Sequence, residues 1–260
     1  MARRGKLTTT PTQRILITHI IGLSASLALA LMGGVWLWLS LVIAVALTIM
    51  TVARLVVART ARIVFTRALE PLAVVVFVLL YIALLTEVYG LPLWQQAGLL
   101  LVAFAMQVRF FLLQFRSRTP HLQTGYSLLL IVLANTLWML IASQNAFFGF
   151  ATLILAWLVN YVIVHYWLER VGYHNSFLAA VWAILAVEVL MISQMALVFY
   201  TLPSTNLVVS RSAVILAVIA YAWGSMLHLH AQRKLSKKLV VEYGMMCAFL
   251  LGFLLFMSGM

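Results

Sequence analysis

Charged residues are scarce in this sequence. Only 8% of its 260 residues are charged, against about 25% in a typical globular domain. A soluble fold would therefore have too few polar side chains to cover its surface. Hydrophobic residues make up 65% of the chain, and uncharged runs long enough to cross about 30 Å of hydrocarbon recur along it. The composition predicts an all-α protein, a polytopic membrane helical bundle.

Acidic residues are scarcer still, because the five acids are all Glu and the chain contains no Asp. This excludes intramembrane aspartyl proteases, aspartyl-phosphate pumps and transferases that hold Mg²⁺ with paired Asp residues. The single cysteine, Cys247, can form neither an internal disulfide nor a Cys-based metal site. The metalloprotease, serine hydrolase, P-loop and dinucleotide-binding motifs are absent as well. We therefore expect no metal or cofactor, and the sequence argues against an enzyme without settling the question.

Nine apolar segments are predicted to cross the membrane as about nine transmembrane helices in a single domain, residues 1–260. The run from Ile15 to Ala53 would be roughly 58 Å long as one helix, so it must turn, and Gly33-Gly34 is the expected place. Pro71 is expected at the first helical position of the third span, where its missing N–H costs nothing. Residues 202–206 should separate the seventh span from the eighth. The predicted spans are residues 15–33, 35–53, 69–89, 95–115, 125–143, 146–168, 177–201, 212–230 and 240–258.

Lys and Arg are distributed unevenly between alternate loops. Of the 17 basic residues, 15 fall in the N-terminal tail and one set of loops, whereas the opposite loops hold only Arg211 and a span holds Arg109. The positive-inside rule then places the N-terminus inside and the C-terminus outside. The net charge of +12 is explained as a topology signal, so nucleic acid is not an expected partner. The plasma (cytoplasmic) membrane is the expected location.

The first apolar run also resembles a signal peptide with a small-residue cleavage site at Ala28-Leu29-Ala30. The run continues past this site to Val35 without the polar region that starts a mature chain. We therefore expect the first helix to be retained.

Four arginines lie among apolar residues between the second and third spans. This segment is either an amphipathic continuation of the second helix along the inner surface or a plain topology loop. In the first case each charge would gain about 1 kcal/mol from anionic lipid. Anionic headgroups on the cytoplasmic side are thus expected partners, with other membrane proteins as a second candidate class. The predicted headgroup contacts are Arg54, Arg59, Arg62 and Arg67.

Glu188 is the strongest candidate for an intramembrane functional residue. It lies near the middle of the seventh predicted span, with Ile184 and Ile192 one turn away on either side. An ionisable residue at the membrane centre costs about 2.5–3.5 kcal/mol on insertion scales. Since a Glu side chain cannot reach across a half-thickness of roughly 15 Å, its carboxyl should point into the bundle and contact a polar side chain. It would there carry a proton or cation, or act as a neutral hydrogen-bonding group between helices.

Further polar side chains recur along the fifth, sixth and eighth spans. Those of the eighth span are spaced so that they share one helix face. Each alone is usually an interhelical hydrogen bond, worth about 0.6 kcal/mol on average, but together they could line a narrow polar route. The candidates for this intramembrane polar site are Glu188, His165, His228, Asn160, Asn135, Tyr221 and Ser225.

Three classes of function remain open. A non-catalytic membrane assembly or scaffold component is the leading one, because the intramembrane polar content is modest and the loops are short. A transporter or channel for a small solute, ion or proton near Glu188 is the first alternative. A membrane-embedded enzyme acting on lipid-linked substrates is the second.

Overall fold

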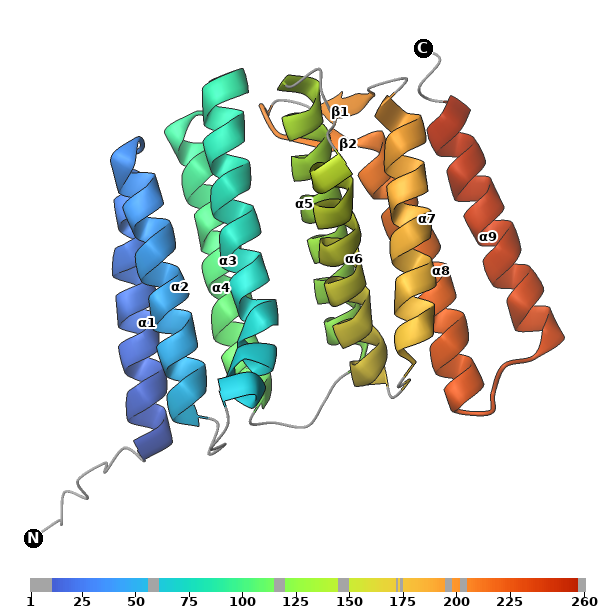
Figure 1. Ribbon diagram of the computed structural model, residues 1–260, viewed down its shortest axis with the longest axis horizontal. Coiled ribbons are helices and arrows are strands. Elements are labelled where there is room, and N and C mark those ends of the chain that lie inside the picture. Colours follow the sequence, from blue (N-terminus) through green and yellow to red (C-terminus); the bar gives the residue numbers. More distant parts are fainter. Residues whose placement is uncertain are drawn as a thin grey trace, which may run out of the picture. The chain divides into compact units, whose positions relative to one another are not determined.

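The computed structural model describes residues 11–55, 61–114, 120–144, 150–171, 173, 175–194, 198–201 and 205–256. These residues form a predominantly helical protein, as predicted, with one short two-stranded sheet (Figure 1). Each predicted span overlaps one helix. The elements are α1 (Pro11–Ala30), α2 (Val35–Leu55), α3 (Ala61–Tyr89), α4 (Leu93–Gln114), α5 (Pro120–Gln144), α6 (Phe150–Val171), α7 (Ser176–Gln194), β1 (Phe199–Thr201), β2 (Val208–Ser210), α8 (Arg211–Ala231) and α9 (Lys237–Phe256).

Five of the described helices contain segments long and apolar enough to cross a membrane. These helices indicate a membrane-embedded protein. Ser127–Ser143 of α5 and Leu153–Glu169 of α6 are shorter apolar stretches. The five segments are Thr12–Ala30, Val35–Leu55, Pro71–Tyr89, Ser176–Gln194 and Arg211–His230.

The chain divides into two compact units. Unit 1 comprises Met1–Ala83 and Pro92–Ser117, and unit 2 comprises Leu84–Leu91 and Arg118–Met260. Unit 1 therefore holds α1, α2, α4 and most of α3, whereas unit 2 holds the remaining helices and the two strands. A single membrane domain stays a prediction.

In unit 1, α1 and α2 form a helical hairpin that turns where the sequence predicts. Gly33 and Gly34 have φ angles of 69° and 55°, which glycine adopts without steric cost. The two helices pack closely through small residues: Gly22 of α1 faces the Leu47 side chain of α2. Such contacts bring helix backbones together where no hydrophobic effect drives helix association.

The third helix begins earlier than predicted. Pro71 lies inside α3 and is buried, so its expected place at the first helical position is wrong. Proline has no N–H to donate to the carbonyl one turn earlier, and membrane helices tolerate such a position. In unit 1 the side-chain amide of Gln107 on α4 donates to the carbonyl of Pro71, which ties α4 to α3 at this point.

The arginine-rich segment does not belong to the second helix alone. Arg54 lies in the last turn of α2, whereas Arg62 and Arg67 lie within the first turns of α3. The residues that were expected to extend the second helix therefore include part of the third. Arg59 lies outside the described residues.

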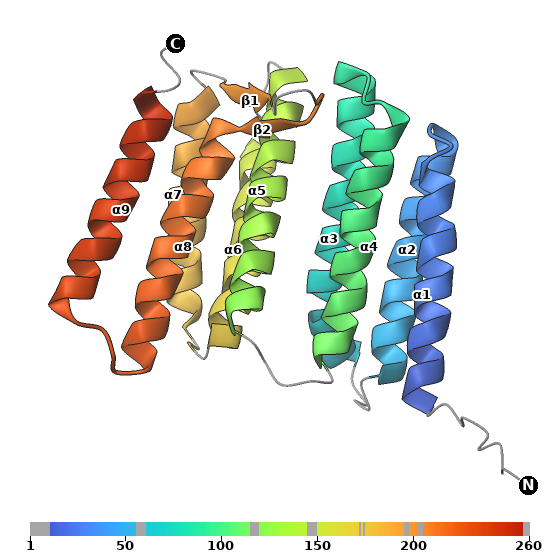
Figure 2. The ribbon, with the colours of Figure 1, turned by 180° about the vertical axis from the view of Figure 1, so that it is seen from behind.

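In unit 2, α5 packs against α6 and α8, and α7 packs against α6 and α8, while α9 packs on α8. The seventh helix ends at Gln194, so its predicted extension to residue 201 is wrong. Phe199–Thr201 instead pairs antiparallel with Val208–Ser210, because β-branched and aromatic residues favour strands. Figure 2 shows this hairpin at the end of unit 2 where α8 begins. Ser210 then caps α8, its hydroxyl accepting a hydrogen bond from Ala213 N at 3.1 Å.

In the interior of unit 2, a tryptophan ring packs directly against a glycine. Trp167 of α6 is fully buried, and a Cβ atom placed on Gly224 of α8 would lie 2.0 Å from its ring. Trp182 of α7 and Trp223 of α8 stack with ring centroids 5.5 Å apart. Only a residue without a side chain at position 224 leaves room for the Trp167 ring.

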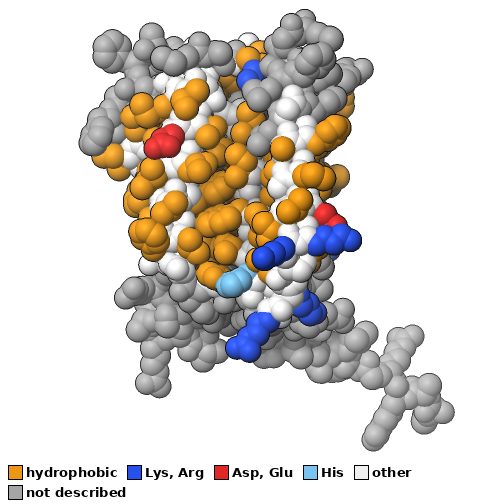
Figure 3. Space-filling model, turned by 90° about the vertical axis from the view of Figure 1, so that its right-hand side faces the viewer, with side chains coloured by type: hydrophobic (Ala, Val, Ile, Leu, Met, Phe, Trp, Pro, Cys, Tyr) orange, Lys and Arg blue, Asp and Glu red, His pale blue; other side chains and the backbone are white. Residues whose placement is uncertain are grey.

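The surface of unit 2 is apolar along its length and basic towards one end. Figure 3 shows hydrophobic side chains over the middle of the face that carries α9, with most of its Lys and Arg side chains gathered at one end. This distribution suits a helical unit surrounded by lipid tails, with its cations at headgroup level.

Candidate functional site

Asn135 and Asn160 are the only two predicted site residues in the described part of unit 2 that are hydrogen-bonded to each other. Each amide nitrogen donates to the oxygen of the other at 3.1 Å, across the α5–α6 contact. Each also donates to a carbonyl one turn earlier in its own helix, Ile131 O at 2.8 Å and Ala156 O at 3.0 Å. Both side chains are buried. The pair is satisfied internally and acts as interhelical glue.

His165 makes its contacts within its own helix. Its ring stacks on that of Tyr161 with centroids 5.5 Å apart, and Tyr161 stacks in turn on Trp157. Its Nε2 lies 3.4 Å from Oε1 of Glu169, one turn further along α6. Trp157, Tyr161 and His165 thus form an aromatic ladder on α6 that ends at a carboxylate.

The three candidates on α8 differ in their exposure. Tyr221 is exposed, whereas Ser225 and His228 are half-buried. Nε2 of His228 lies 2.7 Å from Nε2 of Gln232, one turn later on the same helix. Since an amide nitrogen only donates, His228 Nε2 accepts this bond. No hydrogen bond connects these side chains to His165 or Asn160 among the described residues, and the polar route stays a prediction.

Glu188 does not point into the bundle, contrary to the sequence-based expectation. It is exposed on α7, on the same face as Ile184 and Ile192, which are 51% and 69% exposed. The described residues supply it with no hydrogen bond or ion pair. The reason is visible in the helix pattern: Ala183, Ala186 and Leu190 are buried, so the α7 contacts use the opposite face. Because α7 ends at Gln194, Glu188 also lies six residues, or about 9 Å, from that end rather than at the middle.

Among the described side chains of unit 1, the most buried titratable one is a histidine that the sequence pattern did not single out. His19 of α1 is 1% exposed, and its Nδ1 lies 2.8 Å from the hydroxyl of Thr51 on α2. Its ring meets that of Phe111 on α4 edge-on, with centroids 4.6 Å apart. A signal was present, because His19 is the only titratable residue between Arg14 and Arg54.

Gln107 is another buried polar residue of unit 1, and it is fully buried. It lies four residues before Phe111 on α4, so both occupy the same face of that helix. Its amide nitrogen donates to Pro71, but its Oε1 has no partner among the described residues, and neither has Nε2 of His19. A buried acceptor without a partner costs about 1–3 kcal/mol. Unit 1 therefore contains two buried polar atoms, His19 Nε2 and Gln107 Oε1, that have no hydrogen-bond partner among the described residues.

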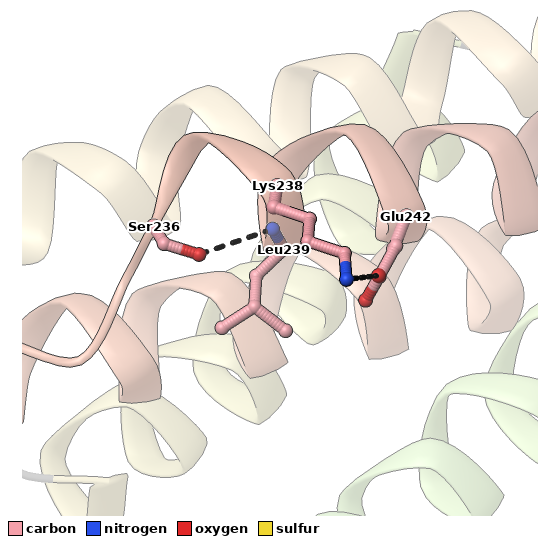
Figure 4. A network of polar contacts seen from close by, with 4 residues as sticks. All are labelled: Ser236, Lys238, Leu239 and Glu242. Carbon is pink, nitrogen blue, oxygen red and sulfur yellow. Dashed lines mark hydrogen bonds and ion pairs between the residues drawn. The ribbon is translucent and has the colours of Figure 1, made fainter.

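Of the predicted headgroup contacts, Arg54 is exposed at the end of α2. The side chains of Arg62 and Arg67 and the whole of Arg59 lie outside the described residues. A second basic region lies where α9 begins, at Lys237 and Lys238 (Figure 4). There Lys238 Nζ lies 3.8 Å from Oε1 of Glu242, as expected for a solvated ion pair, and Ser236 accepts from Leu239 N at 3.3 Å.

No group of three or more His, Cys, Asp or Glu side chains is placed to hold a metal ion within the part of the chain that the structure describes. The chain was also compared with known proteins. No protein-family model, curated protein or solved structure matches it.

Proposed function

We propose that this chain is a non-catalytic assembly component of the membrane, which binds another membrane protein through the α7 surface around Glu188. The supporting observation is the exposed position of the Glu188 carboxyl between the exposed apolar side chains of Ile184 and Ile192. We call these three residues, with Met191, the α7 face.

A carboxyl in this position is costly unless a neighbour pairs with it. The Cα–Cβ bond of a helical residue tilts towards the helix N-terminus, so the Glu188 side chain is directed away from the nearer end of α7. A Lys, Arg or strong hydrogen-bond donor on a facing transmembrane helix would remove the cost, and the apolar flanks would pack against the same helix.

The charge on the α7 face favours a different protein over a second copy of this chain. A symmetric dimer through this face would place two Glu188 carboxyls opposite each other. Like charges in a medium of low dielectric repel unless one of them is protonated. A partner helix with a cationic side chain at the matching depth has no such penalty.

The proposal is tested by placing a photo-crosslinking amino acid at position 192 and purifying the chain from its native membrane. We expect an adduct with one protein, and mass spectrometry of the linked peptides should locate it in a transmembrane segment that contains Lys or Arg. Glu188→Leu in the same chain should reduce this adduct about tenfold, the equivalent of 1.4 kcal/mol. Glu188→Gln, which keeps a hydrogen-bonding side chain, should have a smaller effect.

Two controls accompany this experiment. Glu242→Leu removes an exposed carboxylate whose contact is with Lys238 on its own helix, and it should leave the adduct unchanged. The same crosslinker at Leu158, which is exposed on α6, should not give this adduct. The proposal would be contradicted if the crosslinker formed adducts only with lipid, with a second copy or with another part of this chain. It would also be contradicted by an adduct that Glu188→Leu does not reduce.

We further propose that all nine helices cross the plasma membrane as one domain, with the N-terminus inside and the C-terminus outside. The overlap of each predicted span with one helix supports this arrangement, as does the asymmetry of Lys and Arg between alternate loops. Single-cysteine variants at positions 59 and 144, made after replacing Cys247, should be labelled from opposite sides. Labelling of both from one side would exclude nine spans.

Anionic lipid headgroups on the inner surface are the lipid partners we propose for Arg54, Arg59, Arg62 and Arg67. The exposed position of Arg54 at the end of an apolar helix supports this. Replacing all four with Gln should reduce the gain in melting temperature that anionic lipid gives over zwitterionic lipid in detergent micelles. Transport and lipid-linked enzyme chemistry stay alternatives, and no contact among the described residues favours either of them.

A further inference from the structure

The hydrogen bonds around His19 determine which of its ring nitrogens carries the proton. Thr51 Oγ1 lies 2.7 Å from the carbonyl of Leu47, which can only accept, so the single hydroxyl proton is used there. Towards His19 the Thr51 oxygen must therefore accept, and His19 Nδ1 carries the proton that it donates across 2.8 Å. In the neutral ring this leaves Nε2 as an acceptor with a free lone pair.

The same reasoning assigns the unused atom of Gln107. Its amide nitrogen must face the Pro71 carbonyl, because that carbonyl only accepts. Oε1 is then directed elsewhere as a second acceptor without a partner among the described residues. His19 Nε2 and Gln107 Oε1 are thus both acceptors, and two acceptors cannot bond to each other.

The side chains that carry these two acceptors are linked in unit 1 through Phe111. Phe111 meets the His19 ring edge-on at 4.6 Å between centroids, and Gln107 precedes Phe111 by one turn on the same face of α4. Side chains at this spacing have Cβ atoms about 5–6 Å apart. Both residues are at least 99% buried, so bulk solvent does not supply the missing donors.

We propose that unit 1 binds one small neutral molecule, a water, between α1 and α4, where it donates one hydrogen bond to His19 Nε2 and one to Gln107 Oε1. A water carries two O–H donors, which matches the two acceptors. It is also small enough for a site enclosed by helices, and buried waters typically bond to two to four polar groups that lack other partners. The proposal is independent of the α7 face, which belongs to unit 2.

Solid-state NMR of the full chain in lipid bilayers tests this inference. Thr18-His19 is the only Thr-His pair in the sequence, so labelling Thr with ¹³C at its carbonyl and His with ¹⁵N identifies His19 among the six histidines. We expect a neutral ring with protonated Nδ1, a hydrogen-bonded but unprotonated Nε2, and a cross-peak between Nε2 and water.

Gln107→Leu should abolish the water cross-peak, because the water then keeps only one of its two acceptors. Met106→Leu, one residue earlier on α4, should preserve it. A proton on Nε2, an unprotonated Nε2 without a water cross-peak, or a cross-peak that survives Gln107→Leu would each overturn the proposal. If Gln107→Leu does not fold, the protonation state of Nε2 and its cross-peak with water in the wild-type chain still decide the question.

Discussion

Two sets of buried polar side chains, one in each unit, use their hydrogen-bonding capacity differently. In unit 2, Asn135 and Asn160 donate to and accept from each other, and each amide also bonds to its own helix. In unit 1, His19 and Gln107 each use one end of the side chain and leave one atom without a partner among the described residues. The two asparagines can set the helix register, but their amides have no hydrogen-bonding capacity left for a ligand. His19 and Gln107 keep such capacity, which is why we place the water site in unit 1.

The helix contacts of the two units also differ in how much room they leave for an added side chain. In unit 2 the rigid ring of Trp167 fills the space above Gly224, with the nearest ring atom 2.0 Å from an added Cβ. In unit 1 the nearest neighbour of an added Cβ at Gly22 is the end of the flexible Leu47 side chain, at 3.0 Å. Unit 2 should therefore tolerate substitution at its helix contacts less than unit 1.

The largest effect is expected from Gly224→Ala. The added methyl group overlaps the Trp167 ring, which is fully buried and cannot move aside. Overpacking typically costs about 1–3 kcal/mol, and we expect the upper end of this range here because the overlap is with a rigid ring. Unfolding of the purified protein in mixed micelles with increasing SDS measures the change.

Two further glycine substitutions sharpen this result. Gly22→Ala should cost less than about 1 kcal/mol, because Leu47 can change rotamer. Gly244→Ala, on an exposed face of α9 with open space around it, should leave the stability unchanged. Equal losses at positions 22 and 224 would remove the difference between the units.

A smaller effect is expected from breaking the asparagine pair. Asn135→Leu leaves Asn160 buried without its partner, which should destabilise the protein by about 1–2 kcal/mol. The double variant Asn135→Leu, Asn160→Leu should be more stable than either single variant, because no polar group is then left unpaired. A double-mutant cycle on SDS unfolding measures the coupling. Strictly additive losses would show that the two asparagines do not hydrogen-bond to each other.

Thr51→Val in unit 1 should cost about 0.6 kcal/mol, the average of an interhelical hydrogen bond in a membrane protein. It removes the acceptor of the His19 Nδ1 proton. Thr48→Val is the matched control, because the Thr48 hydroxyl donates only to Ala44 O of its own helix, at 2.8 Å. Equal melting temperatures of the two variants would contradict a role for Thr51 in orienting His19.

The smallest effect is expected from Lys238→Ala at the start of α9. This ion pair joins side chains that are 86% and 53% exposed, so its contribution should not exceed about 0.5 kcal/mol. Thermal unfolding at low and high salt checks this. A loss comparable to that of Asn135→Leu would show that exposed charges matter as much as the buried amide pair.

Much of the fold was predictable from the sequence, because apolar segments long enough to cross a membrane must form helices that satisfy their own backbone groups. The two glycines at the first turn were equally informative, since the run around them is too long for one span. The end of α7 was not predictable in this way. Residues 199–201 are apolar enough to continue a helix, and only their pairing with residues 208–210 places them in a strand.

The site was less predictable, because composition and spacing identify which residues are unusual but not which way they face. The sequence alone determined that Glu188 interrupts an apolar segment and that Asn135 and Asn160 lie in consecutive apolar segments. Only the tertiary structure decided that the asparagines meet and that Glu188 lies on the exposed face of α7. It also brought His19 of α1 together with Thr51 of α2 and Phe111 of α4. The rotation of each helix about its axis depends on which residues its neighbours offer for packing, and a single helix sequence does not contain that information.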